Sequence, residues 1–96
     1  MQFEWDPNKE KVNRRKHGIA FKEAVSVFKH PLSITTYDPD HSKEEDRFIT
    51  FGFSAAGQLL MVAHTDRGDR IRIISARILT RAEREAYEEE IQRRKS

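Results

Sequence analysis

The sequence of 96 residues contains no cysteine and only four glycines and three prolines. Without cysteine the chain has no disulfide, thiolate metal site or cysteine nucleophile, which fits a reducing compartment. The glycines are scattered, so there is no glycine-rich phosphate loop and no support for nucleotide hydrolysis. The apolar runs fall far short of the roughly 20 residues that cross a bilayer, and the first residues lack the layout of a signal peptide. We therefore expect a cytoplasmic protein that does not contact membranes.

Charged residues make up 35% of the sequence, and their signs nearly cancel to a formal net charge of +2. They are grouped along the chain. Residues 9–16 are mostly basic, residues 38–46 are mostly acidic, and residues 67–84 hold six arginines against two acidic residues. Arginine suits fork-like hydrogen bonding to phosphate, so the third group favours a phosphate-binding surface. The alternative is an ordinary solvated surface on which opposite charges pair.

Local patterns predict two helices after a first strand at residues 2–5. Asp6, Pro7 and Gly18 are suitable as the N-cap, the first helical residue and the terminating residue of a helix over residues 7–17. Apolar residues spaced by three and four positions predict a second short helix over residues 21–28. Its N-cap position offers only Ala20, which has no side-chain acceptor.

The rest of the chain reads as strands followed by one helix. Strands are predicted at residues 33–37, 47–53, 58–65 and 70–77, and the short links between them imply antiparallel pairing. Thr80 and Glu83 form a capping box for a C-terminal helix. We therefore predict a single small α+β domain over residues 1–96, of order β-α-α-β-β-β-α with three or four strands in the middle, and with helices packed on an antiparallel sheet. A domain of this size buries little surface, so a protein partner or a second copy is expected.

The last predicted strand loses its alternation at Ile73 and Ile74. A strict period of two would bury arginines on either choice of face. A β-bulge at this step would instead turn Ile71, Ala76 and one of the two isoleucines inward. The outward face would then carry Arg70, Arg72, Ser75 and Arg77. This face is either a phosphate-binding surface or a solvated strand whose arginines pair with the acidic residues 38–46.

The four histidines, at positions 17, 30, 41 and 64, have no metal-ligand spacing, so we predict no metal site and no other cofactor. His64 lies beside the arginine strand and is either a packed side chain or an acid–base group. His17 ends a basic helix, where an imidazolium suits the negative helix terminus. Ser75 has no evident histidine and aspartate partners in sequence order, so a serine nucleophile is not indicated.

Matching residues along nearly the whole chain resemble the BrnT family of type II toxins. They are Phe3-Glu4-Trp5-Asp6-Pro7, Asn13, Lys16-His17-Gly18, Phe21-Lys22-Glu23-Ala24, Val27-Phe28, Asp38, His41-Ser42, Glu45, Arg47, Gly52, Thr65-Asp66-Arg67, Ile71-Arg72-Ile73-Ile74-Ser75-Ala76-Arg77, Arg81, Glu83, Arg84 and Tyr87. The resemblance implies a RelE-like ribonuclease fold and a toxin that cleaves RNA. It also implies a BrnA-type antitoxin from the adjacent gene, which covers the toxin and contacts DNA at their shared promoter.

Metal-free RNA cleavage requires a deprotonated 2′-hydroxyl, a stabilised five-coordinate phosphate and a protonated 5′-oxygen. We assign charge stabilisation to Arg77 and Arg47 with support from Arg72, and proton transfer to His17 or His64. The predicted RNA-binding residues are Lys16, Arg70 and Arg81 for phosphates, Tyr87 for base stacking, and Trp5, which is otherwise a core residue.

The sequence thus predicts a metal-independent endoribonuclease toxin that attacks phosphate through the RNA 2′-hydroxyl. The alternative is a non-catalytic module that binds nucleic acid or docks the antitoxin. We expect a hetero-oligomer with the antitoxin, with a homodimer as the other arrangement. The antitoxin is expected to place acidic residues over the arginine-rich strand.

Overall fold

In the computed structural model, residues 1–95 are described and form five strands, three α-helices and one 3₁₀ turn. The elements are β1 (Gln2–Trp5), α1 (Pro7–His17), α2 (Phe21–Val27), β2 (Ile34–Tyr37), η1 (Pro39–His41), β3 (Arg47–Phe53), β4 (Leu59–Arg67), β5 (Arg70–Ile78) and α3 (Arg81–Lys95). Each element predicted from the sequence is present, with ends that differ by a residue or two. No helix within residues 1–95 is long and apolar enough to cross a membrane.

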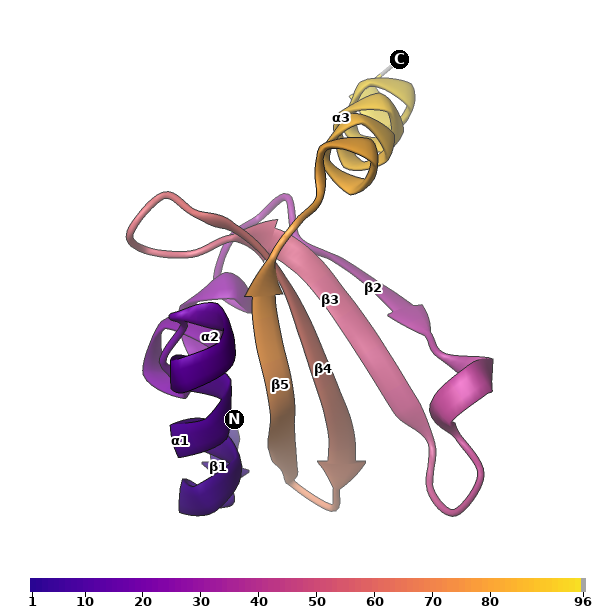
Figure 1. The fold of residues 1–96 in the computed structure, drawn as a ribbon. Helices are drawn as coiled ribbons and strands as arrows, with labels where there is room; N and C mark the ends of the chain where they lie inside the picture. Colours follow the sequence, from indigo (N-terminus) through magenta and orange to yellow (C-terminus); the bar gives the residue numbers. More distant parts are fainter. Residues whose placement is uncertain (96) are drawn as a thin grey trace.

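The five strands form one sheet in the order β1-β5-β4-β3-β2 (Figure 1). The strands from β2 to β5 pair antiparallel, as predicted, but β1 pairs parallel to β5, with Gln2 opposite Arg70. The prediction of an antiparallel sheet was therefore wrong, because the sheet is mixed. Four strands lie between α2 and α3, so the larger of the two predicted strand numbers is correct and the order β-α-α-β-β-β-α is one strand short. Local patterns do not reveal where β1 pairs, because its partner lies at the other end of the chain.

The helix ends follow the predicted capping, with one addition. The Asp6 carboxylate accepts a hydrogen bond of 2.8 Å from the backbone N–H of Asn8, and Gly18 ends α1 with a positive φ of 73°. Ala20 makes no side-chain cap, as its type requires. Instead, the Glu10 carboxylate of α1 accepts a 3.1 Å hydrogen bond from the backbone N–H of Phe21. One helix therefore caps the next, which offsets the loss expected at the start of α2.

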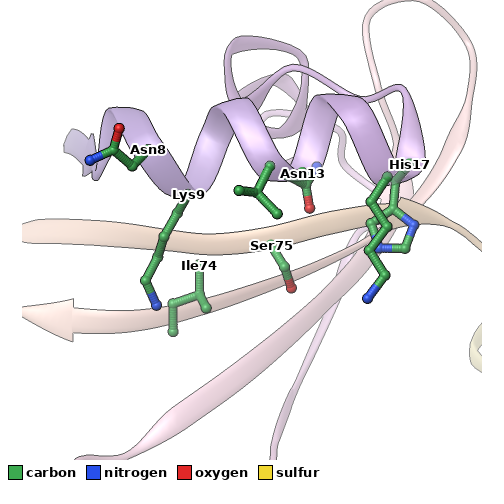
Figure 2. Close-up of a pocket in the computed structure, with 8 residues that line it drawn as sticks. Asn8, Lys9, Asn13, His17, Ile74 and Ser75 are labelled. Carbon is green, nitrogen blue, oxygen red and sulfur yellow. The ribbon is translucent and has the colours of Figure 1, made fainter.

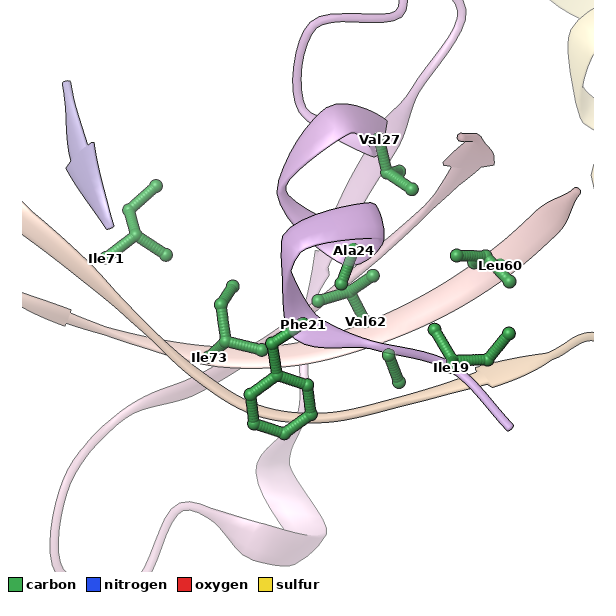
Figure 3. Packing of buried hydrophobic residues seen from close by; sticks show 9 residues of the cluster. Ile19, Phe21, Ala24, Val27, Leu60, Val62, Ile71 and Ile73 are labelled. Carbon is green, nitrogen blue, oxygen red and sulfur yellow. The ribbon is translucent and has the colours of Figure 1, made fainter. Parts of the chain in front are cut away.

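The main core lies between α2 and one face of the sheet (Figure 3). Phe21, Ala24 and Val27 of α2 are fully buried against apolar side chains of β4 and β5. The β4 and β5 residues of this cluster are Leu60, Val62, Ile71, Ile73 and Ala76. Burying each of the larger side chains contributes roughly 1.5–3 kcal/mol. This core fixes which face of β5 points inward and hence which face carries its arginines.

The opposite side of the sheet is only partly covered. We call it the outer face, and it carries Arg47, Ile49, Arg72, Ser75 and Arg77, all of which are half-buried rather than buried. A second apolar cluster fills the end of this face nearest α3 and consists of Ile34, Leu59, Leu79 and Tyr87 with neighbouring half-buried side chains. From there α3 projects beyond the end of the sheet (Figure 1). The rest of the outer face is left open to a partner or substrate.

Candidate functional site

The predicted β-bulge is present in β5 and sets the direction of its polar side chains. Ala63 of β4 pairs with Ser75, whereas the next residue, His64, pairs with Ile73, so Ile74 is the extra residue of the bulge. Ile71, Ile73 and Ala76 are buried in the core, whereas Arg72, Ser75 and Arg77 are half-buried. The bulge therefore keeps the arginines out of the core on both sides of the irregular step, as the sequence predicts.

Two of the predicted phosphate-binding residues lie in one row across the outer face. Arg72 of β5 is opposite Thr65 of β4, which is opposite Arg47 of β3. Residues that are directly opposite on neighbouring strands point to the same face, and two strand spacings amount to roughly 10 Å. Arg47 makes no side-chain hydrogen bond or ion pair within residues 1–95. Its guanidinium is therefore available to an anion on this face.

Arg77 lies at the other end of the outer face from Arg47. It is opposite Met61, which is opposite Phe51, four positions along β3 from Arg47. Two strand spacings and four residues of rise separate the two arginines by roughly 16 Å. A joint role on one phosphate would require Arg77 and Arg47 to lie side by side. The structure does not place them so. Ser75 is the near neighbour of Arg77, two residues away on the same face and roughly 7 Å distant.

The arginines of β5 are held by carboxylates. The Arg72 guanidinium donates a 2.7 Å hydrogen bond to Glu4 of β1, and Arg70 approaches the same carboxylate at 3.6 Å. This hydrogen bond from Arg72 is the main reason that the pKa of Glu4 is lowered. Neither pair involves residues 38–46, the acidic segment that the alternative interpretation named as the partner. Within residues 1–95, that segment pairs instead with Arg67, through Glu45 at 3.1 Å.

Arg77 makes a bidentate ion pair. Its two terminal nitrogens donate to the two carboxylate oxygens of Glu83 at 2.7 and 2.8 Å. Glu83 also accepts from the backbone N–H of Thr80 at 2.8 Å, so it serves both the ion pair and the capping box of α3. The hydrogen bonds from Arg77 are the main cause that lowers the pKa of Glu83 to about 2. The ion pair connects the outer face to the first turn of α3.

A groove of about 360 Å³ lies between α1 and the edge of β5 (Figure 2). It is lined by Asn8, Lys9, Val12, Asn13, Lys16, His17, Ile74 and Ser75, with no acidic residue among them. The side chains of Lys9, Lys16 and His17 make no hydrogen bond or ion pair within residues 1–95. The two basic segments of the sequence, residues 9–16 and the β5 strand, are thus neighbours, and the groove continues onto the outer face at Ser75.

Asn13 holds α1 against the edge of β5, a role that the sequence analysis did not assign. It is 5% exposed. Its amide nitrogen donates to the carbonyls of Ile19 and Ala76, both at 2.9 Å, and its amide oxygen accepts from the Ala76 N–H at 3.0 Å. Because β1 pairs only with residues 70–73 of β5, Asn13 takes the place of a missing strand beyond that point. The sequence signals for it are the match of Asn13 to the BrnT family and its uncharged polar side chain inside a basic helix.

His64 lies on the other side of the sheet from the arginines. It is 3% exposed and pairs with Ile73 in the core-facing row. Its Nε2 is 2.8 Å from the Thr50 hydroxyl, and the rings of Phe28 and Phe48 flank it. Burial is the main cause that lowers its pKa below the model-peptide value of 6.5. Of the two predicted acid–base histidines, His64 lies in the core beside β5, and only His17 lines the groove that Ser75 of β5 also lines.

The other predicted RNA-binding residues differ in whether they are packed inside the protein or exposed. Tyr87 is 6% exposed and donates a 2.7 Å hydrogen bond to the Leu32 carbonyl, so its ring is committed to packing. Trp5 packs against the core and meets Phe21 edge-on at 6.0 Å between ring centroids. Arg81 is exposed at the start of α3 and pairs with Glu85 at 3.3 Å. Within residues 1–95, no three histidine, cysteine, aspartate or glutamate side chains gather as a metal-binding group.

Comparisons with known proteins give one family and one fold. The family described as "Ribonuclease toxin, BrnT, of type II toxin-antitoxin system" matches residues 5–83. Among solved structures, the chain is similar to the 1.1 Å crystal structure of the Brucella abortus ribonuclease toxin BrnT, with a TM-score of 0.58 and 22% identity. The similarity covers 84% of this chain and 99% of that one, and at this identity it shows a shared fold. A search of curated proteins finds no match.

Proposed function

Because the chain belongs to the BrnT family of ribonuclease toxins of type II toxin-antitoxin systems, we propose that it is a metal-independent endoribonuclease of RelE-like fold. The observation that carries the proposal is the contact between the basic helix α1 and the arginine-bearing strand β5. This contact brings His17 and Ser75 to one groove, with Arg77 next along the strand. A phosphodiester on this surface meets cations from both elements and the imidazole of His17.

In the proposed reaction, the RNA 2′-hydroxyl attacks the adjacent phosphorus, and the bond to the 5′-oxygen breaks. Arg77 stabilises the negative charge of the five-coordinate phosphate, since guanidinium matches two phosphate oxygens at once. His17 accepts the 2′-hydroxyl proton or returns a proton to the departing 5′-oxygen. The products are a 2′,3′-cyclic phosphate and a 5′-hydroxyl. His64 is left out of the site because it is buried on the other side of the sheet.

The remaining cations hold the flanking RNA in this proposal. Arg72 and Arg47 bind phosphates along their row of the outer face, while Lys16 binds one at the groove. Arg70 and Arg81 lie at the two ends of this path and are exposed. In the free protein, Arg72 is paired with Glu4 and Arg77 with Glu83. RNA must therefore displace these carboxylates to bind the two guanidinium groups. Each phosphate contact releases condensed counterions from the RNA, so binding weakens as salt rises.

The partner in this proposal is a BrnA-type antitoxin in a hetero-oligomer with the toxin. The juxtaposed basic segments support an acidic contact surface on the antitoxin, since its carboxylates would relieve their mutual repulsion and block RNA at once. The toxin would then meet promoter DNA only through the antitoxin.

The test is cleavage of single-stranded RNA by the purified toxin, freed of antitoxin, in the presence of EDTA. We expect cleavage, with 2′,3′-cyclic or 3′-phosphate ends and 5′-hydroxyl ends. Arg77→Ala and His17→Ala should each reduce the rate, whereas Lys22→Gln on α2 serves as a control away from the site. Activity that requires added divalent metal, or products with 5′-phosphate ends, would refute the mechanism. RNA binding without cleavage would favour a non-catalytic module.

A further inference from the structure

The groove between α1 and β5 is lined by several side chains that have no role in the proposed chemistry. Beyond Lys16 and His17, it is lined by two apolar residues, Val12 and Ile74, and by four polar ones, Asn8, Lys9, Asn13 and Ser75. Val12 is 57% exposed in a helix whose other residues are almost all polar. Within residues 1–95, neither the side-chain amide of Asn8 nor the Ser75 hydroxyl has a hydrogen-bond partner.

The groove is held in shape from both sides. Asn13 lies at the bottom of the groove. Its side-chain amide is hydrogen-bonded to the backbone of Ile19 and Ala76, so this amide is not available to a ligand. The β-bulge supplies the other wall, because it brings the consecutive residues Ile74 and Ser75 into the same groove instead of turning them to opposite faces. The result is a concave surface on which two apolar side chains lie among six polar or charged ones.

The charges are arranged along the length of the groove. Lys9 lies at one end and His17 at the other, with Ser75 between them (Figure 2). Lys9 and Lys16 are seven residues apart, which is close to two helical turns and roughly 10 Å along α1. Both point to one side of the helix, since seven residues bring the side chain back to nearly the same direction. The site thus presents an apolar centre flanked by cations, with no carboxylate to repel an anion.

From this arrangement we infer that the groove is a nucleotide-binding subsite for single-stranded RNA, in which one base packs on Val12 and Ile74 and its outer phosphate binds Lys9. The Asn8 amide and the Ser75 hydroxyl provide hydrogen bonds to the edge of the base. The volume of about 360 Å³ lies within the range of small-ligand sites. This inference rests on the proposed function, because it assigns the nucleotide next to the phosphate that Arg77 and His17 would act on.

The experiment measures binding of a short oligoribonucleotide whose 2′-hydroxyls are methylated, so that it is not cleaved. Lys9→Gln should reduce the slope of log affinity against log salt by about 0.7, the value for one phosphate contact on a single strand. The matched control is Lys11→Gln, which removes the same charge from a position roughly 200° around the helix. The control should keep the wild-type slope.

A second variant tests the base contact. Val12→Ala removes apolar contact area from an exposed position, so it should weaken binding by about threefold to fivefold without unfolding the protein. An oligonucleotide that lacks bases should bind both proteins equally. Amide shifts in labelled wild-type protein should be centred on Val12, Ile74 and Ser75.

The outcomes separate the subsite from the proposed function. If wild-type protein cleaves RNA but Lys9→Gln and Val12→Ala behave like Lys11→Gln, the subsite is refuted and the proposed function stands. Binding with the expected slopes and shifts, but no cleavage of unmodified RNA, supports the subsite and refutes the proposed catalysis. If wild-type protein binds no RNA, both fail.

Discussion

The ion pair between Arg77 and Glu83 leads to a prediction that separates a structural from a functional role. The substitution Glu83→Gln removes the charge but keeps an oxygen acceptor for the Thr80 N–H, so the capping box is retained. The fall of the Glu83 pKa from 4.5 to about 2 corresponds to at most about 3 kcal/mol in the free energy of unfolding. About a third of each side chain is exposed, so solvent screening reduces this to about 1–2 kcal/mol.

The expected result has a defined dependence on pH. The pKa of Glu83 is lowered in the folded state, so its contribution is fully present above pH 4.5 and is lost as pH falls toward 2. Unfolding by urea at pH 7 should show wild type more stable than Glu83→Gln by about 1–2 kcal/mol. This corresponds to about 5–10 °C in melting temperature for a domain of this size. By pH 3 more than half of the difference should have disappeared.

A double-mutant cycle with Arg77→Ala completes the test. If the pair accounts for the stability difference, the two substitutions together should cost little more than either alone.

Cleavage should respond differently, because Glu83→Gln frees Arg77 for phosphate and keeps the activity. Arg77→Ala should lower the activity by about 100-fold or more, and lysine at this position should restore it only in part. Glu85→Gln, which removes an exposed pair with Arg81, is the control and should change stability by less than about 0.5 kcal/mol. A difference between wild type and Glu83→Gln that is equal at pH 7 and pH 3 would refute the reasoning.

Three further predictions follow from other parts of the structure. Asn13→Ala leaves the backbone N–H and C=O of Ala76 without partners at the edge of β5, so it should lower the free energy of unfolding by about 3 kcal/mol, measured in urea. A loss under about 1 kcal/mol would contradict the role of Asn13 in holding α1 against β5. Burial lowers the pKa of His64 below 6.5, so wild type should lose stability as pH falls below that value, whereas His64→Gln should show a flatter profile; parallel profiles would contradict the assigned burial. Antitoxin binding should protect Arg70–Ile78 from hydrogen exchange and weaken as salt rises, and protection confined to residues 38–46 would show that inhibition is not direct coverage.

Several features of this protein are determined by short stretches of sequence. Asp6, Pro7 and Gly18 set the ends of α1, and the alternation of apolar residues sets the strands, because both depend on neighbours within a few positions. The bulge at Ile74 is also a local property, since regular pairing would have buried arginines beside the core. Motifs near both ends of the chain were sufficient to indicate the family, which the match over residues 5–83 confirms.

Tertiary structure decided what those elements do together. The parallel pairing of β1 with β5 joins residues from opposite ends of the chain, so no local pattern reports it, and it brings Glu4 to Arg72. The same long-range packing turned His64 into the core and left His17 at the groove. Asn13 gains its role only when α1 meets the unpaired edge of β5. Residue types establish which chemistry is available, but contacts between distant segments decide which side chains share a site. The reason is that burial and charge pairing depend on the residues that are close in space, and these are often far apart in the sequence.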